Sequence, residues 1–410
     1  MAHILLLTPQ LPYPPQQGTS LRNFHLLRAL AHSHTVTLLS FAESDRAADT
    51  ARLAELARVL PPVRVPDRTT GQRLRALLTS RAPDMGRRLR SEAFDAALAD
   101  ALRSEAFDAV QIEGIELAWT IPLIRATSPS IRIVLDCHNA ETELQRRALR
   151  RDLRRPGRWP AAIYSAAQVG RLARFEREAL RAADAVITVS EIDRRQLMAL
   201  ADPVQPMTVI PNVVAVADYH WEGAVPDEAR FDLVFTGKMD YRPNVDGVLW
   251  FAEEIWPLVR RARPATTWAI VGQRPHARLM SLGNEPGITL TGRVAQVQPY
   301  LAGAGVYTLP LRIGSGTRLK LIESMAAGCA VVSTTIGAEG FALENGREVI
   351  LADTPEAFAA AVLALLDDPV QRQALGKRAR AFAAQYDWRR VGPLLDGVYD
   401  GLLAGGGVRI

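Results

Sequence analysis

A glycine-rich turn followed by two basic residues is the stretch of this sequence best suited to bind a charged ligand. In "PLRIGSGTRLKLIESM" an apolar run predicts a strand, two glycines predict a turn, and a helical run begins at Thr317. The free N–H groups of a helix start favour acidic residues, yet this start carries Arg318 and Lys320. A bound phosphate would make those cations favourable, and glycines let the backbone approach it. We therefore predict an anion site, in preference to a tight turn with two solvated cations, at Gly314, Ser315, Gly316, Thr317, Arg318 and Lys320.

An acidic residue follows within the same predicted helix. Glu323 lies at the edge of the apolar face, where a carboxylate needs hydrogen-bond donors. A ribose offers two adjacent hydroxyls that match the two carboxylate oxygens. A surface ion pair with Lys320, three residues earlier, explains Glu323 equally well, so the residue alone does not decide between the two interpretations.

Two further cations follow a predicted strand at 231–237. The segment "FTGKMDYRPN" places Lys238 and Arg242 in the next loop, where they suit a diphosphate; a solvated basic loop is the alternative. The sequence has no Asp-x-Asp pair and no His and Cys cluster at ligand spacing. We therefore expect no metal and no other cofactor, with the charge of a diphosphate balanced by Lys, Arg and helix ends.

Two loops in the N-terminal half carry candidate catalytic residues. In "TPQLPYPPQQGTSLRNFH" the residue Gly18 frees the backbone, Thr19 or Ser20 can cap the next helix, and Arg22 lies in its first turn. In "VLDCHNAETE" a strand ends just before His138, which could hydrogen-bond a substrate hydroxyl or stabilise a transition state. An ordinary strand-to-helix loop and a loop histidine remain open as alternatives.

Short apolar runs alternate with helical ones in both halves of the chain, and they must position these residues. Strands that are apolar throughout indicate parallel sheets covered by helices on both faces. Two such doubly wound domains predict a ligand cleft at the carboxyl ends of their strands. The predicted strands are 3–8, 35–40, 108–113, 131–136, 184–190 and 207–210, then 231–237, 267–272, 288–292, 305–310, 330–334 and 348–351.

The predicted domain boundaries follow from this pattern. We expect an N-terminal domain at 1–212, a weakly patterned linker at 213–230 and a C-terminal domain at 231–386. The amphipathic segment 387–410 is expected to return to the first domain as a helix.

Composition places the chain among globular proteins. It is 48% hydrophobic and 23% charged over 410 residues, and its two cysteines lie far apart in apolar runs. No run is long enough to cross a bilayer and no signal peptide is visible, so we expect a cytoplasmic protein. The net charge of +5 is concentrated at 144–182, where eleven arginines face three acidic residues. This stretch is a candidate for peripheral binding to an anionic membrane surface, with a solvated basic surface as the alternative. Nucleic acid is not an expected partner.

The combination of these segments resembles the family-4-type retaining glycosyltransferases, group 1, which have the GT-B architecture of two Rossmann-like domains. The segment 309–334 is similar to the nucleotide-sugar signature of that family, and the Gly18 loop, "DCHNAE" and "FTGKMDYRPN" lie at the expected positions. The resemblance implies a metal-independent enzyme of the hexosyltransferase type that uses a nucleotide diphosphate sugar as donor.

The resemblance also implies roles for single residues. Glu323 would hold the ribose hydroxyls, the glycine turn would lie near the donor phosphate and sugar, and Lys238 with Arg242 would contact the diphosphate. Gly18 would approach the reacting centre, and His138 would lie near the transferred sugar. Two positions depart from the family pattern, because Ser315 replaces an acid and Asn244 replaces a second basic residue.

The implied function is transfer of a sugar to a glycan or lipid-linked acceptor, in cell-surface or extracellular polysaccharide synthesis. A sugar-nucleotide epimerase of the same fold is one alternative, with His138, Glu113 and Glu141 as its candidate acid and base residues. A non-catalytic nucleotide-sugar-binding protein is another.

Overall fold

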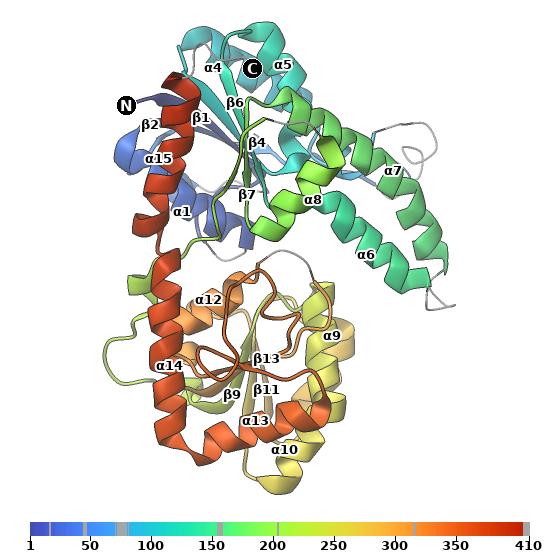
Figure 1. The fold of residues 1–410 in the computed structure, drawn as a ribbon, viewed down its shortest axis with the longest axis vertical. Coiled ribbons are helices and arrows are strands. Elements are labelled where there is room, and N and C mark those ends of the chain that lie inside the picture. The colour runs from blue at the N-terminus through green and yellow to red at the C-terminus, as the bar shows by residue number, and fades with distance from the viewer. Residues whose placement is uncertain are drawn as a thin grey trace. The chain divides into compact units, whose positions relative to one another are not determined.

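The computed structural model describes residues 1–15, 18–43, 47–69, 71, 80, 82–153, 159–202, 205–314 and 317–404. The chain forms two compact units (Figure 1). Unit 1 comprises Met1–Val213 and Trp388–Ile410, and unit 2 comprises Val214–Asp387. Each unit contains one parallel β-sheet with helices around it. The expected fold class, two doubly wound parallel-sheet domains, is therefore confirmed.

Unit 1 is built on a sheet with the strand order β3-β2-β1-β5-β6-β7-β8, and β4 pairs with β2. The paired strands of this sheet run parallel. Its strands are β1 (His3–Thr8), β2 (Thr35–Ala42), β3 (Arg58–Val59), β4 (Val63–Arg64), β5 (Ala109–Glu113), β6 (Arg132–Cys137), β7 (Ala185–Thr188) and β8 (Met207–Val209). Its helices are α1 (Gly18–Ser33), α2 (Ala47–Leu53), α4 (Glu92–Ser104), α5 (Ile121–Thr127), α6 (Glu141–Leu153), α7 (Trp159–Ala182), α8 (Glu191–Ala201) and α15 (Trp388–Ala404).

Alternation along β1 shows why both faces of this sheet are apolar. Leu5 and Leu7 belong to a core that also contains apolar residues of α4, α5, α7 and α8. Ile4 and Leu6 belong to a second core, which contains residues of α1 and α15. Successive strand residues point to opposite faces, so a strand covered on both faces must be apolar throughout.

The last described helix completes unit 1. Val391, Leu395 and Tyr399 of α15 are buried in the same core as Leu26 and Leu30 of α1. The amphipathic pattern of 387–403 thus has its partner within unit 1, although the whole of unit 2 separates this helix from Val213 in the chain.

Unit 2 has the strand order β11-β10-β9-β12-β13-β14, and its paired strands also run parallel. Its strands are β9 (Phe231–Thr236), β10 (Trp268–Val271), β11 (Ile288–Gly292), β12 (Ala304–Leu309), β13 (Val331–Ser333) and β14 (Ile350–Leu351). Its α-helices are α9 (Arg242–Trp250), α10 (Trp256–Ala262), α11 (Gln298–Ala302), α12 (Leu319–Ala326), α13 (Pro355–Asp367) and α14 (Pro369–Ala383), and Phe251–Ile255 forms a π-helical turn between α9 and α10.

The segment interpreted from the sequence as a linker lies largely within unit 2. Val214 bridges to Asp387, and two short 3₁₀-helices follow at Val216–Tyr219 and Asp227–Ala229. Tyr219 is buried. The weak apolar pattern of 211–230 therefore reflects short turns that are packed on unit 2.

All twelve predicted strands are present, with ends that shift by up to two residues. The two short edge strands β3 and β4 were not predicted. Among the described residues, no helix is long and apolar enough to cross a membrane.

Candidate functional site

The strand order of unit 2 reverses between β9 and β12, which is where a sheet of this type holds its ligand. The side chain of Lys320, from the first turn of α12, reaches the carboxyl end of β9. Its Nζ donates to the Thr236 carbonyl oxygen over 2.8 Å and to the Asn244 Oδ1 over 2.7 Å. Gly237 leaves room for it, since a Cβ at that position would lie 2.4 Å from Nζ.

The ammonium of Lys320 donates its hydrogen bonds to two neutral acceptors. Burial lowers its pKa, Glu323 opposes that shift and Arg318 adds to it, and the resulting pKa is about 7. The Nζ also lies 4.5 Å from the centre of the Phe235 ring. In the part of the chain that the structure describes, Lys320 forms no ion pair with a carboxylate. A buried cation without a counter-charge indicates a place for an anion.

Glu323 lies one turn further along α12, and its partner is a tyrosine rather than Lys320. The Tyr219 hydroxyl donates to Glu323 Oε1 over 2.5 Å. Burial raises the pKa of Glu323, while the hydrogen bond from Tyr219 and the charge of Lys320 lower it. Among the described residues, none forms a hydrogen bond with the second carboxylate oxygen, which can accept one from a ligand.

Arg318 is buried, contrary to the expectation of a helix-start cation open to a ligand. Its Nη2 lies 3.7 Å from Glu339 Oε2 and 3.4 Å from the Ile336 carbonyl oxygen. Gly314 makes this position possible, because a Cβ there would lie 2.3 Å from Nη2. Arg318 therefore ties the turn after β12 to the segment after β13.

The start of α12 also differs from the expectation. The helix begins at Leu319 rather than Thr317, and Arg318 is its N-cap, with an extended backbone and no side-chain cap. Because the backbone of Arg318 is extended, its side chain does not take the direction of a side chain in the first turn of the helix. Ser315 and Gly316 lie outside the described residues.

The two cations of the loop after β9 lie at the surface. Lys238 is about one-third exposed and pairs with Asp240 over 3.7 Å. Arg242 is the first residue of α9. Asn244, which replaces a basic residue of the family pattern, accepts a hydrogen bond from Lys320 and donates to the Lys238 carbonyl oxygen over 2.8 Å. The structure thus brings Lys320, Asn244 and the Lys238 backbone together.

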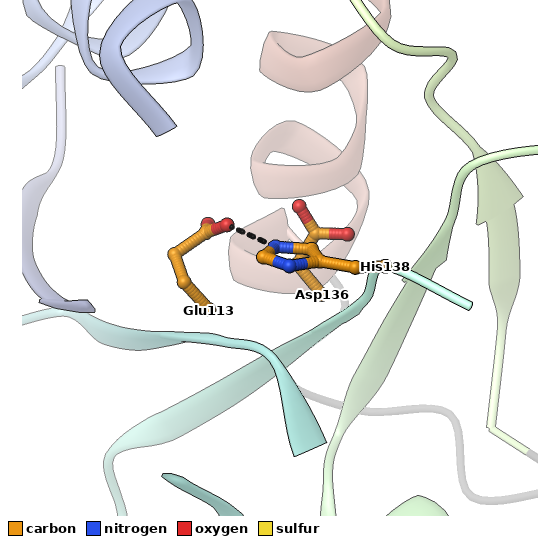
Figure 2. A group of neighbouring side chains, drawn as sticks. All are labelled: Glu113, Asp136 and His138. Carbon is orange, nitrogen blue, oxygen red and sulfur yellow. Dashed lines mark hydrogen bonds and ion pairs between the residues drawn. The ribbon is translucent and has the colours of Figure 1, made fainter. Parts of the chain in front are cut away.

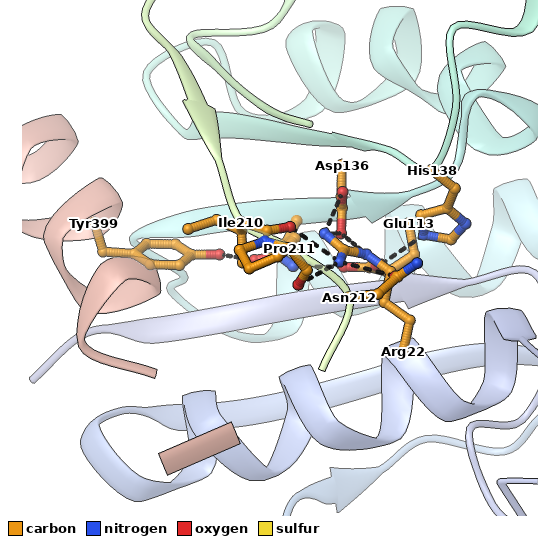
Figure 3. Close-up of polar contacts among 9 residues, drawn as sticks. Arg22, Glu113, Asp136, His138, Ile210, Pro211, Asn212 and Tyr399 are labelled. Carbon is orange, nitrogen blue, oxygen red and sulfur yellow. Dashed lines mark hydrogen bonds and ion pairs between the residues drawn. The ribbon is translucent and has the colours of Figure 1, made fainter. Parts of the chain in front are cut away.

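The strand order of unit 1 reverses between β1 and β5, and a buried charged cluster lies there (Figure 3). Arg22 of α1 makes a bidentate pair with Asp136 at the end of β6, with both N–H···O distances 2.9 Å. Its Nη1 donates to the carbonyl oxygens of Ile210 and Pro211, each at 3.1 Å. The guanidinium of Arg22 thus donates to groups of the protein itself, and it holds the segment that follows β8 in place.

The candidate catalytic histidine belongs to the same cluster (Figure 2). His138 Nε2 lies 3.1 Å from Glu113 Oε2, and Glu113 is fully buried. The Gln111 amide donates to Glu113 Oε1 over 2.5 Å, and the Tyr399 hydroxyl of α15 donates in turn to Gln111. The Asn23 amide, oriented with its nitrogen toward Glu113, donates to Oε2 over 2.9 Å.

Two basic groups and two carboxyl groups lie together in this cluster, and each shifts the pKa of its neighbours. Burial alone would lower the pKa of His138, but the hydrogen bond to Glu113 and the charge of Asp136 outweigh burial and raise it. Burial alone would raise the pKa of Glu113, but His138 and Arg22 lower it. Burial raises the pKa of Asp136 to about 7, and the charge of Arg22 opposes that rise.

Buried carboxylates on two helices hold the loop that carries His138. Asp193 of α8 accepts from the Ala140 N–H over 3.1 Å. Glu176 of α7 accepts from the Glu141 and Thr142 N–H groups over 2.9 and 3.1 Å, which satisfies the free donors at the start of α6. A histidine on so constrained a loop is held in one place.

Glu113, Asp136 and His138 also have the residue types of a metal site, with one ligand atom of each within 4.8 Å of the others. Their oxygens, however, already accept hydrogen bonds from Arg22, His138 and Gln111. A guanidinium, not an open coordination position, faces Asp136. The cluster fits a hydrogen-bonded ion network better than a metal.

Two family models match the chain along most of its length. Residues 17–218 match Glycosyltransferase Family 4, and residues 230–368 match Glycosyl transferases group 1. The chain belongs to these glycosyltransferases. A phosphatidyl-myo-inositol mannosyltransferase of Mycolicibacterium smegmatis is 31% identical over 235 residues, which are 55% of this chain and 58% of that protein. A glycogen synthase of Mycobacterium tuberculosis is 26% identical over 235 residues, 54% of this chain and 55% of that protein. This glycosyltransferase spans about half the length of these relatives.

Solved structures show the same fold over the whole chain. A sucrose-phosphate synthase from Thermosynechococcus elongatus aligns over 99% of this chain and 100% of its own, with a TM-score of 0.71 and 16% identity. WaaG, a glycosyltransferase involved in lipopolysaccharide biosynthesis, covers 98% of this chain and 100% of its own, with a TM-score of 0.62 and 16% identity. HepE of Anabaena, in complex with UDP-glucose, covers 98% and 100%, with a TM-score of 0.64 and 14% identity. The GT-B architecture of this glycosyltransferase is thereby shown.

Sequence reasoning named candidate residues but missed most of the partners that the structure gives them. Gly18 is the first residue of α1, so Thr19 and Ser20 lie in the helix instead of capping it. The partners that were missed are Tyr219 for Glu323, Asn23 and Gln111 for Glu113, and Glu339 for Arg318. Each is far away in the chain or of a common residue type, and no local pattern marks it. The roles assigned to single residues remain predictions.

Proposed function

We propose that this protein transfers a sugar from a nucleotide diphosphate sugar to a glycan or lipid-linked acceptor. The observation that carries the proposal is the pairing, on one turn of α12, of a buried cation with a carboxylate at the strand switch point of unit 2. A nucleotide diphosphate sugar has the matching groups, an anionic diphosphate and a ribose with two hydroxyls. Membership in the glycosyltransferase family supports the same conclusion.

The donor is proposed to bind with its ribose on the free oxygen of Glu323 and its diphosphate near Lys320 and the turn at Gly314. Lys238 and Arg242 add positive charge at the edge of this site. Arg318 acts from behind, by holding the turn. In this proposal cationic side chains and backbone N–H groups stabilise the charge of the departing diphosphate, and no metal is needed.

The transfer is proposed to proceed with retention at the anomeric carbon. The bond from that carbon to the diphosphate oxygen breaks, and a bond to the acceptor hydroxyl oxygen forms on the same face. The departing diphosphate oxygen takes the proton of the acceptor hydroxyl. His138, held by Glu113, is proposed to hydrogen-bond the transferred sugar, and Gly18 to leave space beside it. Arg22 would position these groups through Asp136 rather than touch the substrate.

A thermal-shift screen against nucleotide diphosphate sugars, including UDP-glucose and GDP-mannose, tests donor binding. A donor present at 100 times its Kd should add about 2.7 kcal/mol to the stability of the folded state. Substituting Glu323→Ala should abolish the shift, and substituting the exposed Glu356→Ala, on α13, should leave it unchanged. No shift with any nucleotide would contradict the proposal.

NMR of the reaction separates transfer from the alternatives. With donor and acceptor, the new anomeric signal should have the configuration of the donor. Epimerisation of the donor without acceptor would instead support a sugar-nucleotide epimerase. Binding with no turnover under any acceptor condition would support a sensor. The named activity of the phosphatidyl-myo-inositol mannosyltransferase relative makes a lipid-linked acceptor the first to try.

A peripheral membrane site is proposed on the pair of helices α6 and α7, which pack against each other (Figure 1). Arg146 and Arg150 lie on α6, and the end of α6 and the start of α7 expose the apolar side chains of Leu153 and Tyr164. Basic residues beside exposed apolar ones suit an anionic lipid surface. Such a site would place the protein on the cytoplasmic face of the membrane. Part of the stretch 144–182 lies outside the described residues.

Liposome sedimentation at low salt tests this site. Vesicles with anionic lipid should bind the protein, and the variant R146E/R150E should lose binding by a factor of about ten or more, at about 1 kcal/mol per charge. The matched control R261E/K377E, which changes two exposed cations of unit 2 by the same charge, should bind like the wild type. Equal losses in both variants would contradict a local site.

A further inference from the structure

Within the described residues, the ammonium of Lys320 has no carboxylate among its hydrogen-bond partners. Its two hydrogen-bond acceptors are a backbone carbonyl and an amide oxygen, both neutral. Arg318, in contrast, is paired with Glu339, Lys238 with Asp240, and Arg312 with Asp246 at 3.1 Å. An ammonium in such surroundings is easily neutralised, and a bound anion would restore its proton.

The groups that face Lys320 make this exchange possible. On its own helix side, Glu323 favours the charged form and Arg318 disfavours it. From β9 it meets Thr236 and the ring of Phe235, and from α9 the amide of Asn244. The Tyr307 hydroxyl of β12 bonds to Thr236 over 2.8 Å, and burial keeps that phenol neutral by raising its pKa. Glu323 is thus the acidic group of this set, and Tyr219 already holds one of its oxygens.

Two neighbouring residues shape the space that the ammonium of Lys320 occupies. Gly237 has no Cβ where the ammonium lies, and Asn244 offers Oδ1 to the ammonium while its amide is fixed on the Lys238 carbonyl. A larger side chain at Gly237 or a cation at 244 would collide with Lys320 or repel it. The family pattern has a basic residue at position 244, where this chain has Asn244. Lys320 therefore supplies a cation at the same place from α12.

We propose that Lys320 couples donor binding to proton uptake, so that the empty site releases this proton more readily than the diphosphate-bound site. This inference rests on the proposed function and adds a regulation to it. Because the bound state holds more protons than the empty state, affinity must fall as the pH rises. The fall should begin near pH 7, where the free Lys320 has its pKa, and approach tenfold per pH unit above it.

Calorimetric titration with UDP-glucose tests the coupling. In a diphosphate sugar both phosphates are esterified, so the ligand itself exchanges no proton near pH 7. Titrations at pH 8 in two buffers of different ionisation enthalpy should report uptake of close to one proton, and titrations at pH 6 close to none. GDP-mannose serves as a second probe in the same design.

Three variants assign the proton. Lys320→Met should bind more weakly and take up no proton, and Lys320→Arg should bind without proton uptake and with pH-independent affinity, since a guanidinium stays charged. Lys238→Met is the matched control: it should weaken binding at every pH while the proton count stays that of the wild type. Circular dichroism and the melting temperature establish that each variant is folded.

The outcomes separate this inference from the proposed function. Binding of a nucleotide sugar with the same proton count in wild type and Lys320→Met would overturn the role of Lys320 and leave donor binding intact. The loss of proton uptake in Glu323→Gln, with uptake retained in Lys320→Arg, would assign the proton to Glu323 instead and also overturn it. Failure of the folded wild type to bind either nucleotide sugar would overturn both proposals.

Discussion

The Tyr219 hydroxyl donates to Glu323 Oε1 over 2.5 Å, so a residue at the start of unit 2 orients the carboxylate proposed to bind ribose. Tyr219 uses one oxygen and leaves the other for the ligand. The same hydrogen bond opposes the rise in the pKa of Glu323 that burial causes. The tyrosine thus favours the charged form of the carboxylate and orients it.

Tyr219→Phe should therefore weaken nucleotide-sugar binding. A hydrogen bond to a charged group contributes about 1.5–3 kcal/mol, which corresponds to a loss in affinity of roughly 10- to 100-fold. Calorimetry measures this loss at pH 6, below the pKa of about 7 at which Lys320 releases its proton. Tighter binding in the variant would show instead that Tyr219 competes with the ribose.

Glu113→Gln should lower the pKa of His138, measured by NMR of the imidazole. The carboxylate raises that pKa against burial, and a neutral amide leaves burial unopposed. The raised pKa of His138 contributes stability below its unfolded value of about 6.5, and the lowered pKa of Glu113 contributes stability above about 4.5. The variant should thus be destabilised most between these two pH values, and less as the pH rises through the folded pKa of His138. A pH-independent difference in urea unfolding would contradict this account.

Arg22 and Asp136 should behave as one unit in a double-mutant cycle. Arg22→Met or Asp136→Leu alone leaves a buried charge unpaired and should cost about 3–5 kcal/mol of unfolding free energy. The double variant should cost much less than the sum of the two, because no charge is left unpaired. Urea denaturation measures all three, and simple additivity would show that the pair is not coupled.

His138→Ala should affect turnover and not donor binding. His138 belongs to unit 1, whereas the residues proposed to hold the donor belong to unit 2. The rate of transfer should fall by roughly 10²-fold or more, with the nucleotide-sugar Kd unchanged. Glu323→Ala should show the reverse pattern, a weaker Kd. An equal effect of both variants on Kd would contradict the division of roles.

The fold could be predicted from the sequence because strands covered on both faces are apolar without interruption. The run at β1, with Leu5 and Leu7 on one face and Ile4 and Leu6 on the other, illustrates this. The two-residue strands β3 and β4 carry no such pattern, and neither does the segment around Tyr219, which is turned back onto unit 2 by short 3₁₀-helices.

The sequence suggested candidate residues for a site, but it did not predict their contacts. Glycines and cations near a helix start drew attention to Gly314, Arg318 and Lys320. Their side chains nevertheless point to different partners, because α12 begins two residues later than the sequence indicated. The pairing of Arg22 with Asp136 joins residues more than one hundred positions apart, and nothing local to either residue announces it.

The contact between Tyr399 and Gln111 has a consequence for synthesis of the chain. Unit 2 is continuous in sequence, so it can fold on the ribosome as soon as Asp387 has emerged from the exit tunnel. Most of unit 1 is synthesised before unit 2, but its core is complete only after α15 has been synthesised. This helix covers Ile4, Leu6 and Gln111. Until then that apolar face is exposed, and chaperones would find their binding surface there.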